Sequence, residues 1–183
     1  MRVMVACEFS GIVRDAFLAL GHDAISCDLL LSERPGPHWR TDIRLLRLSR
    51  FDLLIAFPPC TYLCRAGARW YSNSPEQAEA LDFVRFLMDA PVDRIAIENP
   101  AGRISTAIRK PDQVIQPYQF GHGEVKKTCL WLKNLPPLQS TQVVEGRVPR
   151  VHFEAPGPDR WKRRSRTLVG IAQAMAVQWG KEN

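Results

Sequence analysis

The chain has 183 residues, of which 45% are hydrophobic and 24% are charged, and its formal net charge is +6. This composition is typical of a folded globular protein and excludes a disordered or collagen-like chain. No apolar stretch approaches the ~20 residues of a membrane-spanning helix. The N-terminus lacks the long apolar core and the cleavage site of a secretory signal. We therefore expect a single domain over residues 1–183 that does not contact a membrane.

The net charge and the cysteine content indicate what kind of partner the protein binds and which redox compartment it occupies. The sequence pI of about 9.3 favours an anionic partner, with nucleic acid first. The five cysteines are odd in number and scattered, which argues against a disulfide framework and favours the reducing cytoplasm. Cys60 and Cys64 have the spacing of a metal-binding pair, but no second Cys or His pair complements them, so we expect no metal.

Strand-like and helix-like segments alternate along the chain. We expect strands at 3–6, 24–28, 51–57, 94–98 and 128–132, and helices at 12–20, 74–88 and 168–179, with a short helix around 45–48. Ser74 is a suitable N-cap, with Pro75 in the first turn and Gln77 placed to complete a capping box. The alternation predicts an α/β fold, a doubly wound parallel sheet with helices on both faces.

Polar residues follow the predicted strands at their carboxyl ends, where ligands bind in open α/β sheets. They are Cys7–Gly11, Asp28, Thr41–Ile43, Pro58–Cys60 and Glu98–Pro100. Each segment alone fits an ordinary turn, a cap or a core position. Their occurrence in order, one at each strand end, predicts a single site at this edge of the sheet.

Two of these segments resemble motifs of one enzyme family, the DNA cytosine-5 methyltransferases. Pro58-Pro59-Cys60, followed by Gly67, resembles the nucleophile motif, and Glu98-Asn99-Pro100 resembles the Glu-Asn-Val motif. Weaker similarities cover most of the remaining chain: Phe9-Ser10-Gly11 to the Phe-x-Gly-x-Gly loop, Gly21-His22 with Asp28, Thr41-Asp42-Ile43 to Gly-Asp-Ile, and Gly170-Ile171-Ala172 to the closing motif.

The resemblance implies a Rossmann-like sheet of the S-adenosylmethionine-dependent methyltransferase type. It implies methylation of carbon 5 of cytosine in DNA through a covalent cysteine adduct, with Cys60 and Glu98 as the catalytic residues. The residues that it assigns to the cofactor, S-adenosyl-L-methionine, are Glu8, Phe9, Ser10, Gly11, Asp28, Asp42, Ile43 and Pro58.

The residue types fit this chemistry. Carbon 5 of cytosine is a poor nucleophile until a thiolate adds to carbon 6 and converts the ring to an enamine. An acid must donate to ring nitrogen 3 at the same time. Cys60 and Glu98 follow strands that we expect to be neighbours, so both can face one pocket. A base within a duplex would have to be flipped out.

The chain departs from the family pattern in three places. The glycine loop has only Gly11, with Val13 where the second glycine belongs. The Arg-x-Arg motif has no clean counterpart, although Lys126 and Lys127 lie in roughly that place. Before the closing helix there is only a short Pro/Gly/Arg-rich stretch, 136–166, instead of a long target-recognition region. We therefore expect little sequence specificity without a separate partner, as would suit a small phage or prophage enzyme.

A basic stretch within this insertion has an aromatic residue among its cations. Cations interleaved with an aromatic ring suit phosphate contact and base stacking, although a solvated loop has the same composition. We take Lys126, Lys127, Arg160, Trp161, Arg163 and Arg164 as the nucleic-acid-binding residues.

Two other functions fit the same sequence. The missing recognition region favours an enzyme that acts on free cytosine nucleotides or RNA, whereas the basic stretch argues for a polymer. The depleted glycine loop favours a non-catalytic nucleic-acid-binding module on the same fold. The presence of both Cys60 and Glu98 argues against that module.

Overall fold

The computed structural model describes residues 1–65 and 68–181. Gly67 of the nucleophile-like motif lies outside the described residues. Seven strands of the described chain form one sheet, in the order β3-β2-β1-β4-β5-β7-β6. Their bounds are β1 Arg2–Ala6, β2 Asp23–Asp28, β3 His38–Arg40, β4 Leu53–Ala56, β5 Arg94–Pro100, β6 Gln113–Ile115 and β7 Thr128–Lys133.

The first five strands are parallel, and β7 runs antiparallel to both of its neighbours. All five predicted strands are confirmed, as is the doubly wound α/β class. The sheet is mostly parallel, with β7 antiparallel where it lies between β5 and β6. The three-residue strands β3 and β6 were not predicted, since so short a segment carries no periodicity.

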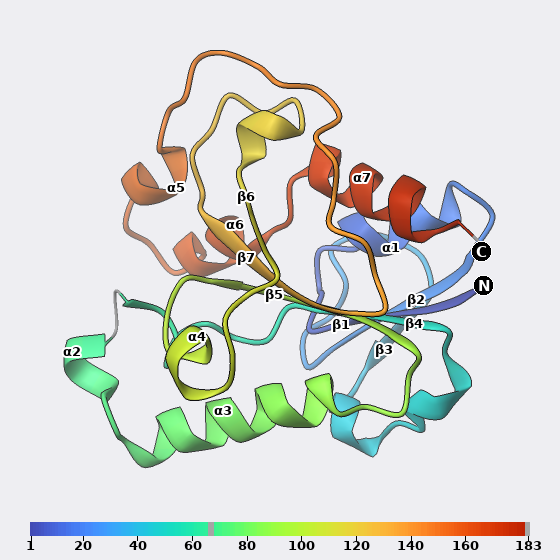
Figure 1. Cartoon of the computed structure of the whole chain (residues 1–183), viewed down its shortest axis with the longest axis horizontal. Coiled ribbons are helices and arrows are strands. Elements are labelled where there is room, and N and C mark those ends of the chain that lie inside the picture. The colour runs from blue at the N-terminus through green and yellow to red at the C-terminus, as the bar shows by residue number, and fades with distance from the viewer. Residues whose placement is uncertain (66–67, 182–183) are drawn as a thin grey trace.

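Helices cover both faces of this sheet (Figure 1). Helix α1 (Ile12–Leu18) and helix α7 (Val169–Trp179) pack together on one face, and α3 (Pro75–Met88) with α4 (Ile104–Ala107) lies on the other. Two 3-10 turns, Ile43–Leu45 and Leu48–Arg50, replace the predicted short helix. The remaining short helical segments are α2 Ala68–Tyr71, η4 Pro117–Gln119, α5 Arg150–Phe153 and α6 Arg160–Ser165.

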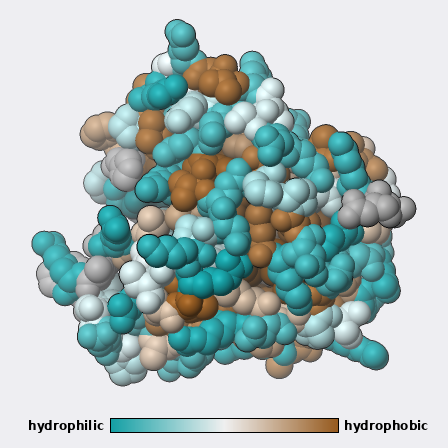
Figure 2. Space-filling model, in the orientation of Figure 1, coloured by the Kyte–Doolittle hydropathy of each residue, from teal (hydrophilic) through white to brown (hydrophobic). Residues whose placement is uncertain are grey.

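The central strands are buried on both faces, which is why their sequences are almost wholly apolar. Along β1, Val3 and Val5 pack against the α1–α7 side, whereas Met4 packs against the α3 side. This alternation follows from the two-residue period of a strand. Figure 2 shows hydrophilic side chains over much of the outer face, with apolar patches between them. None of the helices in the described part of the chain has the length and apolar character to cross a bilayer.

The start of α3 is tied to the segment that follows Cys60. Ser74 caps the helix as predicted, and its Oγ accepts a hydrogen bond from the Gln77 backbone N–H at 3.2 Å. Gln77 does not return the bond to Ser74: its side chain accepts from the backbone N–H of Asn73 and donates to the carbonyl of Tyr62 at 3.0 Å. The predicted capping box is therefore half-formed, and buried Gln77 anchors a loop of the candidate site instead.

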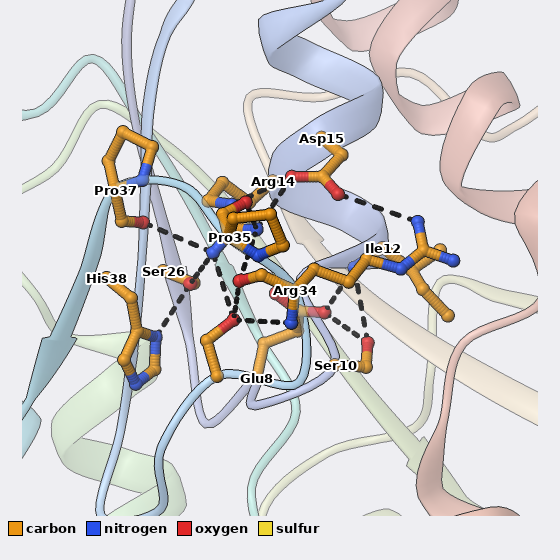
Figure 3. A network of polar contacts seen from close by, with 11 residues as sticks. Glu8, Ser10, Ile12, Arg14, Asp15, Ser26, Arg34, Pro35, Pro37 and His38 are labelled. Atoms are coloured by element: carbon orange, nitrogen blue, oxygen red, sulfur yellow. Dashed lines mark hydrogen bonds and ion pairs between the residues drawn. The ribbon is translucent and has the colours of Figure 1, made fainter.

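A buried arginine holds the connection between β2 and β3 (Figure 3). The side chain of Arg14 in α1 is fully buried and pairs with Asp15 at 2.8 Å. Its remaining donors reach the hydroxyls of Ser26 and Ser32 and the carbonyls of Arg34, Pro35 and Pro37, at 3.0–3.4 Å. One guanidinium therefore fixes the course of the connection across the end of the sheet.

Gly11 and Gly36 pack directly on this guanidinium. A Cβ at Gly36 would lie 2.9 Å from Cζ of Arg14, and a Cβ at Gly11 would overlap its terminal nitrogen. Both glycines also adopt positive φ, at +74° for Gly11 and +138° for Gly36. The single glycine of the loop after β1 therefore serves the packing of Arg14.

Replacing Arg14 should cost much of the stability of the fold. We expect Arg14→Met to lower the free energy of unfolding by about 2–4 kcal/mol, because buried carbonyls and hydroxyls lose their donor. Arg34→Met removes an exposed partner of the same Asp15 and should cost less than about 1 kcal/mol. Urea denaturation measures both values, and similar losses in the two variants would contradict the assignment.

Candidate active site

Two adjoining cavities open at the carboxyl ends of the parallel strands. Their volumes are about 400 Å³ and about 620 Å³, and both are lined by Cys7 and Pro59. Cys7 follows β1 and Pro59 follows β4, so the shared wall lies where the strand order reverses direction. This reversal is the position at which doubly wound sheets bind ligands.

The first cavity carries an excess of acidic groups. Asp28, Asp42, Glu76 and Glu79 line it, with Arg44 as the one cation among its described lining residues. Burial raises the pKa of Asp28, and its carboxylate accepts a hydrogen bond from the Leu30 N–H at 2.9 Å. Hydrogen bonds from Arg44 lower the pKa of Asp42, so that carboxylate already has a protein partner. This charge distribution disfavours phosphate groups and suits ligands that present hydroxyl donors.

Apolar side chains complete the first cavity. Ile43, which follows Asp42, lines it together with Phe83 of α3. The guanidinium of Arg44 lies 5.7 Å from the centre of the Phe83 ring. Asp28, Asp42 and Ile43 are therefore brought together, apart from the other predicted cofactor residues.

The second cavity gathers the two predicted catalytic residues with most of the other predicted contacts. Cys60 and Glu98 both line it. The predicted residues that share this lining are Glu8, Phe9, Ser10, Pro58, Lys126, Lys127, Trp161 and Arg164. Gly11 lines neither cavity, because it faces Arg14.

The loop that carries Cys60 is docked onto the loop that follows Glu98. Asn99 is buried, and its side-chain amide donates to the carbonyl of Pro58 at 2.7 Å. Further along, Cys64 forms an isolated antiparallel bridge with Gly102. A Cβ at Gly102 would overlap the carbonyl oxygen of Leu63, so only glycine permits this approach. Gly102 gave no signal in the sequence, because its constraint comes from a segment about 40 residues away.

Cys60 itself is exposed to the cavity at the start of a tight turn. Its carbonyl accepts from the N–H of Cys64 at 2.9 Å. Burial in the cleft raises the pKa of the Cys60 thiol, and the nearby Cys64 and Glu98 raise it further, while Lys126 opposes the rise. The thiol is therefore the resting form, and the thiolate has to be stabilised within the cleft.

Glu98 lies in a setting that favours its protonated form. Burial raises its pKa, against smaller opposing effects from the charge of Lys126 and a hydrogen bond with Thr128. A raised pKa suits a carboxyl group to act as a proton donor. Thr128, at the start of β7, was not predicted as part of the site.

The loop after β1 places a second buried carboxylate in the larger cavity. Cys7 adopts a left-handed φ of 57°, which turns the chain toward Glu8. Glu8 accepts hydrogen bonds from the Ser10 hydroxyl and, at 2.9 Å, from the Ile12 N–H at the start of α1. Its other carboxylate oxygen is buried and has no partner among the described residues. Such an atom is poised to accept from a ligand.

The basic segment, residues 160–166, contributes one wall of the larger cavity through Trp161, Arg164 and Arg166. The Trp161 ring lies 5.9 Å from that of Phe9, and the Lys126 ammonium donates to the Arg164 carbonyl at 3.1 Å. Arg166 closes this wall with two hydrogen bonds of 2.7 Å to Glu33.

Two of the predicted nucleic-acid contacts lie elsewhere. Arg163 pairs with the Glu154 carboxylate, and Arg160 donates to the Glu154 carbonyl at 2.8 Å. Neither arginine lines the larger cavity.

Comparison with known proteins bears on the fold. No protein-family model matches the chain, and no curated protein matches it. Among solved structures, the chain is similar to the Entamoeba histolytica methyltransferase EhMeth, with a TM-score of 0.52 and 11% identity over 86% of this chain and 60% of that one. The S. pombe Dnmt2 methyltransferase gives a TM-score of 0.48 and 16% identity, over 87% of this chain and 57% of that one.

The chain thus spans about 60% of the length of the methyltransferase that it resembles. At 11% identity the likeness concerns the fold alone. The chain has a mixed α/β fold with a mostly parallel seven-stranded sheet, consistent with the Rossmann-like fold of methyltransferases.

Proposed function

We propose that this protein methylates carbon 5 of cytosine in a nucleic acid, most favourably DNA, with S-adenosyl-L-methionine as the methyl donor. The observation that carries the proposal is the meeting of Cys60 and Glu98 in one cavity that shares a wall with a second, acidic cavity. The fold of the chain and the resemblance of its motifs to those of cytosine-5 methyltransferases support the same function.

The two cavities fit the two halves of the proposed cofactor. Its nucleoside half carries hydroxyl donors and no phosphate, which suits the acidic first cavity and the carboxylate of Asp28. Its amino-acid half carries an ammonium group, for which the unpaired oxygen of Glu8 is a fitting acceptor. When bound, the cofactor supplies an electrophilic methyl group.

The chain's own residues would act on the cytosine ring. The Cys60 thiolate adds to carbon 6, while Glu98 donates its proton to nitrogen 3, so that negative charge does not build up on the ring. Carbon 5 then becomes nucleophilic and takes up the methyl group. Loss of the carbon-5 proton to water expels the Cys60 sulfur as a thiolate, and nitrogen 3 returns its proton to Glu98, which restores the aromatic ring. Asn99 and Gly102 hold the loop that carries Cys60 against the loop that follows Glu98.

The cationic wall supports a polynucleotide as the carrier of the cytosine. Lys126, Lys127, Arg164 and Arg166 surround the larger cavity, and Trp161 adds an aromatic surface. These groups suit phosphates and an unstacked base. RNA and free cytosine nucleotides present the same ring, and a substrate panel separates them from DNA.

The proposed cofactor site makes a prediction for Asp28. We expect S-adenosylhomocysteine to bind the wild-type protein, and Asp28→Ala to weaken binding by about 1–3 kcal/mol through loss of a ribose hydrogen bond. Asp23→Ala, at the exposed opposite end of β2, serves as the control and should bind normally. Calorimetry measures all three, and absence of heat and of any thermal shift with the wild-type protein would contradict the proposed cofactor.

The nucleophile makes a second prediction. Cys60→Ser should abolish methyl transfer, whereas Cys64→Ser, one turn along the same loop, should retain it. An oligonucleotide containing 5-fluorocytosine should trap a covalent adduct on Cys60, because fluorine cannot leave as the carbon-5 proton does. Peptide mapping locates the adduct. An adduct on Cys64, or wild-type turnover by Cys60→Ser, would show that the mechanism is wrong.

A further inference from the structure

Lys126 is held in the larger cavity by hydrogen bonds from three directions. Its backbone N–H donates to the Gln116 side chain at 3.1 Å, and its carbonyl accepts from the Thr128 hydroxyl at 3.0 Å. Its ammonium donates to the Arg164 carbonyl at the end of α6, at 3.1 Å. Because an ammonium has three N–H donors, two remain for other groups in the cavity.

This placement differs from that of the neighbouring lysine. Lys126 is half-buried, whereas Lys127 is exposed, although both line the cavity. A half-buried charge is less screened by water and salt than an exposed one, so Lys126 acts more strongly than Lys127 on other groups that line the cavity.

Cys60 lines the same cavity, among groups that oppose its ionisation. Glu98 approaches from β5, and the second thiol, Cys64, lies one turn away in the same loop. The other charged residues lining the cavity are Glu8, Lys127, Arg164 and Arg166. Among the described residues that line the cavity, Lys126 is the one whose charge lowers the pKa of the Cys60 thiol.

We propose that Lys126 is the activating residue for Cys60, its ammonium being held within the same cavity by the Arg164 carbonyl so that the thiolate forms beside Glu98. The inference rests on the proposed role of Cys60 as the nucleophile. It gives Lys126 a task distinct from phosphate contact. It also means that α6, which carries Trp161, positions the activating ammonium through the Arg164 carbonyl.

Alkylation of Cys60 by iodoacetamide tests this device without methyl donor or nucleic acid. The thiolate is the reacting species, so the rate against pH reports the pKa of the thiol. Peptide mass spectrometry separates Cys60 from the other cysteines. In Lys126→Met the midpoint should rise by about one pH unit, which slows alkylation about tenfold at a fixed pH below the midpoint.

Three variants control the measurement. Lys126→Arg keeps the charge and should alkylate like the wild type, and Lys127→Met removes a neighbouring charge and should leave the profile unchanged. Glu98→Gln cannot ionise, so it removes the negative charge that Glu98 acquires once the pH exceeds its raised pKa, and any shift of the Cys60 midpoint should be downward. If Lys126→Met loses its fold, Lys126→Gln keeps a donor for the Arg164 carbonyl and should show the same upward shift.

An unshifted profile in folded Lys126→Met, or an equal shift in Lys127→Met, would overturn the inference. Failure of the proposed function has a different signature. A shifted alkylation profile with no methyl transfer to any substrate would leave the role of Lys126 standing and refute the methyltransferase reaction.

Discussion

The candidate site depends on the way in which two loops lock together beyond the neighbouring strands β4 and β5. Pro58 and Pro59 have no N–H, so the chain cannot continue the β4 ladder past this point. The carbonyls of the loop hold it instead: the Asn99 amide and the Arg103 N–H donate to those of Pro58 and Leu63, each at 2.7 Å. The same contacts that end the sheet therefore bring Cys60 to the cavity of Glu98.

The two cavities differ in charge because different segments of the chain line them. Acidic residues after β2 and β3 and at the start of α3 surround the first cavity, and basic residues before β7 and in α6 surround the second. The carboxyl groups of buried Glu8 and half-buried Glu98 lie within the basic cavity, where desolvation raises the pKa of each. A phosphate-free nucleoside and a polyanion would thus approach from different sides of the shared wall.

Much of this arrangement is predictable from the sequence, because long apolar strands and capped helices leave strong patterns. Polar residues at strand ends then locate the site without knowledge of the side-chain contacts. Contacts between distant segments were not predictable. In the sequence, Arg14 is only a residue near a loop that has one glycine. In the structure, its buried guanidinium donates hydrogen bonds to carbonyls of residues 34–37. The ion pair between Arg163 and Glu154 was not predictable either, because the sequence does not show which basic side chains already pair with carboxylates of the protein.

The identity of the reaction product tests the proposed function most directly. Duplex DNA, single-stranded DNA, RNA and dCMP would each be incubated with the wild-type protein and S-adenosylmethionine carrying a ¹³C-labelled methyl group, then digested and analysed by mass spectrometry. The account predicts labelled 5-methylcytosine, most abundant in DNA, and none when Cys60 is replaced by serine. Label on the exocyclic nitrogen, or no labelled base in any of the four substrates, would contradict it.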